Sequence, residues 1–273
     1  MFRCLNHGAL RMQCSWRESL PLGKEAGFGG SDVEFDLENS AGEIRDALAL
    51  HELQAGGAMA PVDFMSPETK TKEGLAHVEK IARLAAEIGC TRFTRYILSF
   101  SDELTWKENF RWHVEQFRPI AAVMADHGCS IGLEFLGPRS LRDGHKHAFI
   151  HTMHPMLDLC EQIGPNCGLL LDSWHWYTSL GIVEDIQELR PDQVVYVHIN
   201  DAPRDVLVEQ HQDFDRALAG ETGVIDLSGF LGALRNIGYD GPVTPEPFIS
   251  EFENMPPADV LARVGPGFRE VWK

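Results

Sequence analysis

At 273 residues, the chain is long enough for two small domains or one large one, and its 44% hydrophobic content is ordinary for a soluble protein. Its formal charge is −17, from 24 basic and 41 acidic residues, which argues against nucleic-acid or acidic-membrane partners because like charges repel. No apolar run approaches the roughly 18 residues of a membrane span, and the first residues are too polar for a secretory signal. We therefore expect a cytoplasmic protein whose six cysteines are reduced packing residues.

Short apolar runs alternate with amphipathic stretches along the whole chain. Because strands that alternate with helices build parallel β-α-β units, and a closed barrel contains eight of them, we predict an α/β fold. In this prediction residues 1–273 form a single (β/α)8-barrel domain, a TIM barrel. The eight predicted strands are Phe2–Leu5, Asp32–Phe35, Gln54–Ala58, Phe93–Leu98, Ser130–Phe135, Gly168–Asp172, Val194–Ile199 and Val243–Glu246.

Three of the stretches between these strands carry a clear helical pattern. Apolar residues recur at three- and four-residue spacing over Leu75–Ile88 and over Phe110–Met124, and a glycine follows each stretch, as is typical of a helix end. Pro119 is expected to kink the second of these helices. The pattern predicts a third helix that begins at Asp226 or Ser228, either of which can cap its first turn.

Four successive strands each carry one ionisable residue at or next to their carboxyl end: Glu134, Asp172, His198 and Glu246. A polar residue at a single strand end is usually a turn or cap residue, but four in a row converge on one cavity of a barrel. Three carboxylates gathered there would raise one another's pKa values, and a divalent cation removes that repulsion. We predict one divalent cation at these four residues. The oxygen-rich set favours Mn2+, with Mg2+ or Co2+ next, and Zn2+ also fits.

At these residues the sequence resembles the sugar isomerase/epimerase superfamily with the xylose isomerase-like barrel. Its members include ketose 3-epimerases, hydroxypyruvate isomerase, inosose dehydratase and the AP endonucleases of family 2. The resemblance extends from about Glu73 to Phe248, and three blocks carry it: Gly168–His175, Val195–Asp201, and Gly223–Leu227 together with Gly241–Phe248. It implies the same metal ligands as the strand ends.

The resemblance also implies roles for individual residues. In the ketose 3-epimerases the two ligand glutamates act as acid and base on opposite faces of the substrate, which implies catalytic roles for Glu134 and Glu246. The same enzymes place a substrate-contacting histidine three residues after the ligand aspartate, and an arginine six residues after the ligand histidine. Here these positions are His175 and Arg204. The chain departs from the epimerase pattern at Ser140, where those enzymes carry a further glutamate.

Two more residues are candidates for substrate binding. Arg216 precedes the turn Gly220–Gly223 and either points into the site or pairs with Asp213 or Asp226. His7 stands at the end of the first strand, from which it can line the same cavity.

The chemistry that these residues favour is proton abstraction next to a carbonyl through a metal-stabilised enediolate. We therefore expect an isomerase or epimerase that acts on a sugar or keto-sugar. The alternative is a metal-dependent lyase, such as an inosose dehydratase or an enzyme that eliminates from 3-keto-glycosides, because it shares the first step.

Two other classes are disfavoured. A DNA-repair endonuclease would need a basic groove, and a non-catalytic sugar-binding protein has no need of four metal ligands. No glycine-rich phosphate cradle follows the last two strands, so the expected partner is a small, sugar-like and unphosphorylated molecule. The resemblance adds the expectation of a homo-oligomer.

Overall fold

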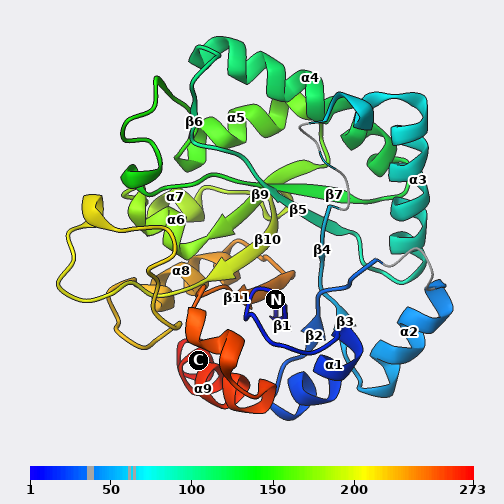
Figure 1. Cartoon of the computed structure of the whole chain (residues 1–273), viewed down its shortest axis with the longest axis vertical. Coiled ribbons are helices and arrows are strands. Elements are labelled where there is room, and N and C mark those ends of the chain that lie inside the picture. The colour runs from blue at the N-terminus through cyan, green and yellow to red at the C-terminus, as the bar shows by residue number, and fades with distance from the viewer. Residues whose placement is uncertain (36–39, 61–62, 64–65) are drawn as a thin grey trace.

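The computed structural model describes residues 1–35, 40–60, 63 and 66–273. In this part of the chain a nine-stranded sheet runs in the order β3-β2-β1-β11-β10-β9-β7-β5-β4, and its pairings are parallel (Figure 1). The bounds are β1 Phe2–Leu5, β2 Gly30–Ser31, β3 Gln54–Ala55, β4 Ala58–Met59, β5 Arg92–Tyr96, β7 Ser130–Glu134, β9 Cys167–Asp172, β10 Val194–Ile199 and β11 Pro242–Pro245.

The two ends of this sheet belong to one short segment of chain. β3 pairs with β2 at one end of the order and β4 pairs with β5 at the other, yet only Gly56 and Gly57 separate them. The sheet therefore closes on itself. β3 and β4 together form the third of the eight strands of the barrel. The predicted (β/α)8 barrel is confirmed.

Helices cover the outside of the barrel (Figure 1). The three predicted helices are present, and the second runs from Trp106 to Ala125 with Pro119 inside it. Asp226, not Ser228, is the N-cap of the third. The helices are α1 Trp16–Glu25, α2 Ala41–Leu50, α3 Lys72–Glu87, α4 Trp106–Ala125, α5 Met153–Ile163, α6 Ser173–Thr178, α7 Val183–Gln187, α8 Leu227–Asn236 and α9 Pro257–Val271.

The second and third predicted strands were wrong in their bounds. The second strand is Gly30–Ser31 instead of Asp32–Phe35, and the third is interrupted after Ala55. At both places the inside of the barrel is crowded. A Cβ atom at Gly30 would clash with the ring of Phe2, and one at Gly57 would lie 2.6 Å from the ring of Tyr196. Glycine is needed where the wall comes this close to interior side chains.

Smaller differences concern the strand ends and the loops beyond them. The fourth strand ends at Tyr96, and Glu246 follows the last strand instead of closing it. A two-stranded antiparallel sheet, formed by β6 Phe100–Ser101 and β8 His147–Ala148, was not predicted from the sequence.

All six cysteines are free thiols. In the described part of the chain, no helix is both long and apolar enough to cross a bilayer.

Candidate metal centre

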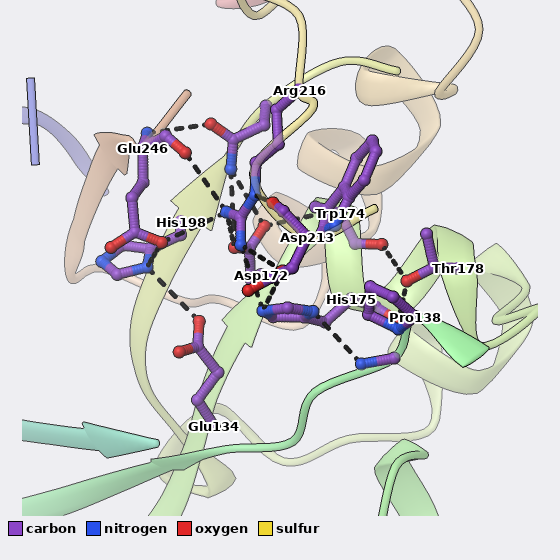
Figure 2. Close-up of polar contacts among 12 residues, drawn as sticks. Glu134, Pro138, Asp172, Trp174, His175, Thr178, His198, Asp213, Arg216 and Glu246 are labelled. Carbon is purple, nitrogen blue, oxygen red and sulfur yellow. Dashed lines mark hydrogen bonds and ion pairs between the residues drawn. The ribbon is translucent and has the colours of Figure 1, made fainter. Parts of the chain in front are cut away.

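The four ionisable residues at the strand ends meet at one end of the barrel (Figure 2). Glu134 and Asp172 are the last residues of β7 and β9, His198 lies one residue before the end of β10, and Glu246 follows Pro245, the last residue of β11. Strand register places His198 beside Asp172. One ligand atom from each of the four lies within 4.8 Å of the others, so the barrel gathers a set that is scattered over more than a hundred residues.

Two atoms at the centre of this cluster are buried without a hydrogen-bond partner among the described residues: Glu134 Oε1 and His198 Nδ1. His198 Nδ1 lies 3.4 Å from Glu134 Oε1 and 3.2 Å from Glu246 Oε2. Buried polar atoms are almost always satisfied in native proteins, so this pair calls for a further partner. Three carboxylates and one imidazole are suitable ligands for a divalent cation. The residues present therefore fit such an ion.

The cluster is electrostatically strained in the absence of a cation. Burial raises the pKa of Glu134 to about 8, a shift that contact with His198 opposes and the charge of Glu246 increases. Burial by itself would lower the pKa of His198, but Glu246 and Glu134 outweigh it and raise that pKa well above its ordinary value. Burial would likewise raise the pKa of Glu246, but His198 and Arg216 lower it. The charges of Glu134, His198 and Glu246 thus depend on one another.

Arg216 reaches into the cluster from the long loop after β10 (Figure 2). Its Nη1 donates to Asp172 Oδ2 over 2.8 Å and to Glu246 Oε2 over 3.2 Å, and its Nη2 donates to Asp213 Oδ1 over 2.9 Å. The guanidinium carbon also lies 4.3 Å from the ring centre of Phe248. Both alternatives considered from the sequence therefore hold, because Arg216 points into the site and also pairs with Asp213. Asp226 instead caps α8.

Asn200 links two of the ligands and was missed by the sequence analysis. Its Nδ2 donates to Asp172 Oδ1 over 3.2 Å, and its Oδ1 accepts the backbone N–H of Glu246 over 3.0 Å. Asp172 Oδ1 also accepts the backbone N–H of Trp174 over 2.8 Å. The available signal was the polar residue two positions after His198, at the end of the same strand. Such outer contacts orient metal ligands.

His175 lies beside this network in its neutral form. The backbone N–H of Gly137 donates to His175 Nδ1 over 3.1 Å, so the neutral ring carries its proton on Nε2. Nε2 is the nitrogen that faces Arg216, with 3.3 Å to Nη2. Burial lowers the pKa of His175 to about 3. The nearby acceptor for this neutral N–H is Asp213, whose Oδ1 lies 3.8 Å from Nε2.

The other two candidates lie farther from the cluster. His7 is paired with Glu34, with 3.3 Å between Nε2 and Oε1, and lines a cavity of about 530 Å³ that Glu246 also lines. Arg204 is exposed, and its Nε and Nη2 donate to the backbone oxygen of Thr222 over 3.1 and 2.8 Å. Within the described residues, the structure thus brings His7 to the cavity beside the cluster but gives Arg204 no contact with a ligand.

Ser140, the point of departure from the epimerase pattern, connects two loops. Its Oγ donates to the backbone oxygen of His211 over 2.9 Å, which ties the loop after β7 to the long loop that carries Arg216. A neutral hydroxyl thus stands where the epimerases carry an acid.

Comparison with known proteins finds relatives that are consistent with the barrel fold and with one another. Residues 20–265 match the model of the xylose isomerase-like TIM barrel family. The chain is 21% identical to inosose isomerase of Bacillus velezensis over 261 residues, which covers 92% of this chain and 90% of that enzyme. It is 26% identical to ketose 3-epimerase of Arthrobacter globiformis over 273 residues, with 94% and 84% covered.

Two solved structures share the whole fold. A xylose isomerase domain protein from Alicyclobacillus acidocaldarius superposes with a TM-score of 0.87 at 26% identity, covering 98% of this chain and 97% of the other. The IOLI protein, solved with a bound zinc atom, superposes with a TM-score of 0.80 at 20% identity, covering 99% and 98%. With a family model matched over most of its length, the chain belongs to the xylose isomerase-like TIM barrel family.

Proposed function

We propose that the protein is a divalent-metal-dependent isomerase or epimerase that acts on a small, unphosphorylated keto-sugar. The observation that carries this proposal is the position of Glu134 and Glu246. Their carboxylates approach the same nitrogen of His198, at 3.4 and 3.2 Å, within a buried cluster that fits a cation. Two carboxylates at one centre can exchange protons with a single substrate.

Glu134, Asp172, His198 and Glu246 would hold the cation, with Mn2+ favoured over the other divalent ions. When bound, such a cation polarises a carbonyl group and stabilises the negative charge that develops on its oxygen. The zinc atom bound to the IOLI protein supports a cation, and the names inosose isomerase and ketose 3-epimerase support an isomerase or epimerase.

The chain itself would move the proton. One of Glu134 and Glu246 removes the proton from the carbon next to the carbonyl, and a carboxyl group of the same pair returns it. Return to the opposite face yields the epimer, whereas return to the neighbouring carbon yields the isomer. His175 would contact the substrate as a neutral ring, and Arg216 would orient Asp172 and Glu246.

The turn after the long loop supports an unphosphorylated substrate. The carboxylate of Asp201 accepts the backbone N–H groups of Thr222, Gly223, Val224 and Ile225 over 2.7–3.1 Å. Backbone amides of this kind are what a phosphate would bind. Because an acidic side chain of the protein already occupies them, a phosphate would meet both blocked donors and a negative charge.

Proton exchange with solvent tests the proposal. The metal-loaded protein is incubated with ketoses, inososes and 3-keto-glycosides in deuterated water and followed by proton NMR, with Glu134→Gln and Glu246→Gln as controls. Deuterium next to a carbonyl together with a new epimer or aldose, lost in both variants, is the expected result. Wash-in with loss of water or of an aglycone would assign a lyase instead. No exchange with any substrate would overturn the proposal.

A further inference from the structure

A cavity beside the metal centre extends it toward the first strands of the barrel. Its volume is about 530 Å³, and Glu246 forms one of its walls. The other lining side chains come from the ends of β1, β2 and β4 and include Asn6, His7, Asp32, Glu34, Phe35 and Met59. A substrate whose reactive end lies at Glu246 therefore has room to extend here.

Asp32 is the polar group that this cavity holds most firmly. Its Oδ1 accepts the hydroxyl of Tyr196 over 2.6 Å, the backbone N–H of Gly57 over 2.9 Å and the thiol of Cys4 over 3.4 Å. Its Oδ2 accepts a single described donor, Asn6 Nδ2, over 2.9 Å. A carboxylate oxygen can accept about two hydrogen bonds. Oδ1 is therefore fully engaged, whereas Oδ2 has capacity for one more donor.

The position of this carboxylate is fixed from several sides. Trp16 Nε1 donates to the backbone oxygen of Asp32 over 2.6 Å. Gly56 faces the carboxylate, and a Cβ atom at this position would lie 2.7 Å from Asp32 Oδ1. Asn6 is itself held, because its Oδ1 accepts the backbone N–H of Ala9 over 2.9 Å. An acceptor that is oriented before the ligand arrives loses little entropy on binding.

The charges in the cavity select the kind of ligand. Asp32, Glu34 and Glu246 are acidic, and His7, the basic side chain among the described lining residues, is paired with Glu34. A carboxylate or phosphate group would be repelled by these acidic side chains. It would also find no unpaired cationic donor among the described lining residues. A hydroxyl group can donate to Asp32, and the C–H face of a sugar or ring polyol can pack on Phe35 and Met59.

We propose that Asp32 is a substrate-binding residue that accepts a hydroxyl of an uncharged polyol or keto-sugar, and that its cavity excludes ligands with an anionic tail. This inference rests on the proposed function in one respect, namely that the reacting end of the substrate lies at Glu246. The inference adds a binding residue that the metal cluster by itself does not determine.

Ligand-observed NMR titration of the metal-loaded full chain tests this inference. The probes are scyllo-inositol, D-fructose and D-fructose 6-phosphate, the last two differing only in the distal group. The expected result is binding of at least one uncharged probe in the millimolar range. Asp32→Asn should weaken that binding about tenfold, the usual size of one charge-assisted hydrogen bond. The phosphate ester should bind at least about tenfold more weakly than D-fructose because of repulsion by the acidic lining.

Two further variants separate a direct contact from a structural role. Tyr196→Phe removes one donor from Oδ1 but leaves Oδ2 and the ring in place, so polyol binding should stay within about twofold. Met59→Arg places a cation at the exposed rim of the cavity and should raise binding of D-fructose 6-phosphate relative to D-fructose about tenfold. Because Met59 is exposed, this second test does not depend on whether Asp32→Asn folds.

Several outcomes would overturn the inference. These are no binding of any uncharged probe, unchanged affinity in folded and metal-loaded Asp32→Asn, an equal loss in Tyr196→Phe, or no gain for the phosphate ester in Met59→Arg. Unchanged affinity in Asp32→Asn with deuterium exchange intact would sink the inference and leave the proposed function standing. Polyol binding that depends on Asp32 in a protein without exchange would do the reverse.

Discussion

Arg216 donates through Nη1 to Asp172 Oδ2 over 2.8 Å, and both side chains are at most 1% exposed. Burial would lower the pKa of Arg216, but Asp172 and Glu246 outweigh it and raise that pKa further. The guanidinium therefore stays charged. A bound divalent cation and Arg216 would together carry three positive charges, which would offset the repulsion among the three carboxylates of the cluster.

Replacing Arg216 should remove activity without removing the cation. In Arg216→Met, Asp172 and Glu246 lose a donor but keep their attraction for a metal, so metal content should not fall, whereas kcat/KM should drop at least about 100-fold as a buried ion pair is broken. Arg216→Lys should recover only part of this loss because an ammonium group cannot reproduce the forked contacts.

Metal analysis and steady-state kinetics check this prediction, with Arg204→Met as the matched control. Arg204 is exposed and bonded to Thr222, so its variant should keep kcat/KM within about threefold. Loss of the cation from Arg216→Met would contradict the prediction and show that metal binding itself requires Arg216.

Removal of the metal should lower thermal stability. A ligand present at 1,000 times its dissociation constant stabilises the folded state by about 4 kcal/mol, which corresponds to roughly 8–16 °C for a chain of this size. Calorimetry of chelated and Mn2+-loaded protein measures this shift. In His198→Asn the shift should largely disappear, and its persistence would place the cation elsewhere.

Replacing Asp201 should lower the free energy of unfolding, although Asp201 is not one of the four candidate metal ligands. Its buried carboxylate accepts the backbone N–H groups of residues 222–225 and of Ala202. Asp201→Ala leaves these donors without partners, and we expect a loss of about 3 kcal/mol or more in the free energy of unfolding. Arg204→Ala, which touches the same turn from the exposed side, should cost about 0.5 kcal/mol or less in denaturant titrations. Equal losses would contradict this account of the turn.

His113 should make the protein less stable in mild acid. It is 3% exposed, and burial lowers its pKa to about 4, whereas an unfolded histidine titrates near 6.5. Between these pH values the unfolded state binds more protons than the folded state. The free energy of unfolding is therefore highest above pH 6.5 and falls as the pH is lowered toward 4. The shift corresponds to about 3 kcal/mol.

Melting temperatures from pH 7 to pH 4.5 check this prediction. His113→Phe keeps an aromatic ring against Phe117 and Phe149 and should show a flatter pH dependence than the natural protein. His154→Gln, at an exposed histidine, should leave the dependence unchanged. A slope that is the same in all three proteins would assign the acid sensitivity to other groups.

The sequence by itself determined the barrel, the run of polar strand ends and three of the helices. These features depend on local pattern, because alternation of apolar runs with amphipathic stretches needs no knowledge of what packs against what. The four residues that the structure brings together were readable for the same reason, since each is the ionisable residue at or next to the end of an apolar strand.

Only the tertiary structure decided the features that depend on contacts between distant segments. The third strand is split at Gly56 and Gly57, where Asp32, which follows β2, and Tyr196 of β10 leave no room for larger side chains. Asn200 could not be assigned because its partners, Asp172 and the backbone of Glu246, lie on neighbouring strands. Arg204 and Arg216 are both loop arginines in the sequence, and only folding of the long loop directs Arg216 to the carboxylates and Arg204 to the outside of the turn. A loop has no periodicity that fixes the direction of its side chains, so its contacts emerge only when the chain is closed around the site.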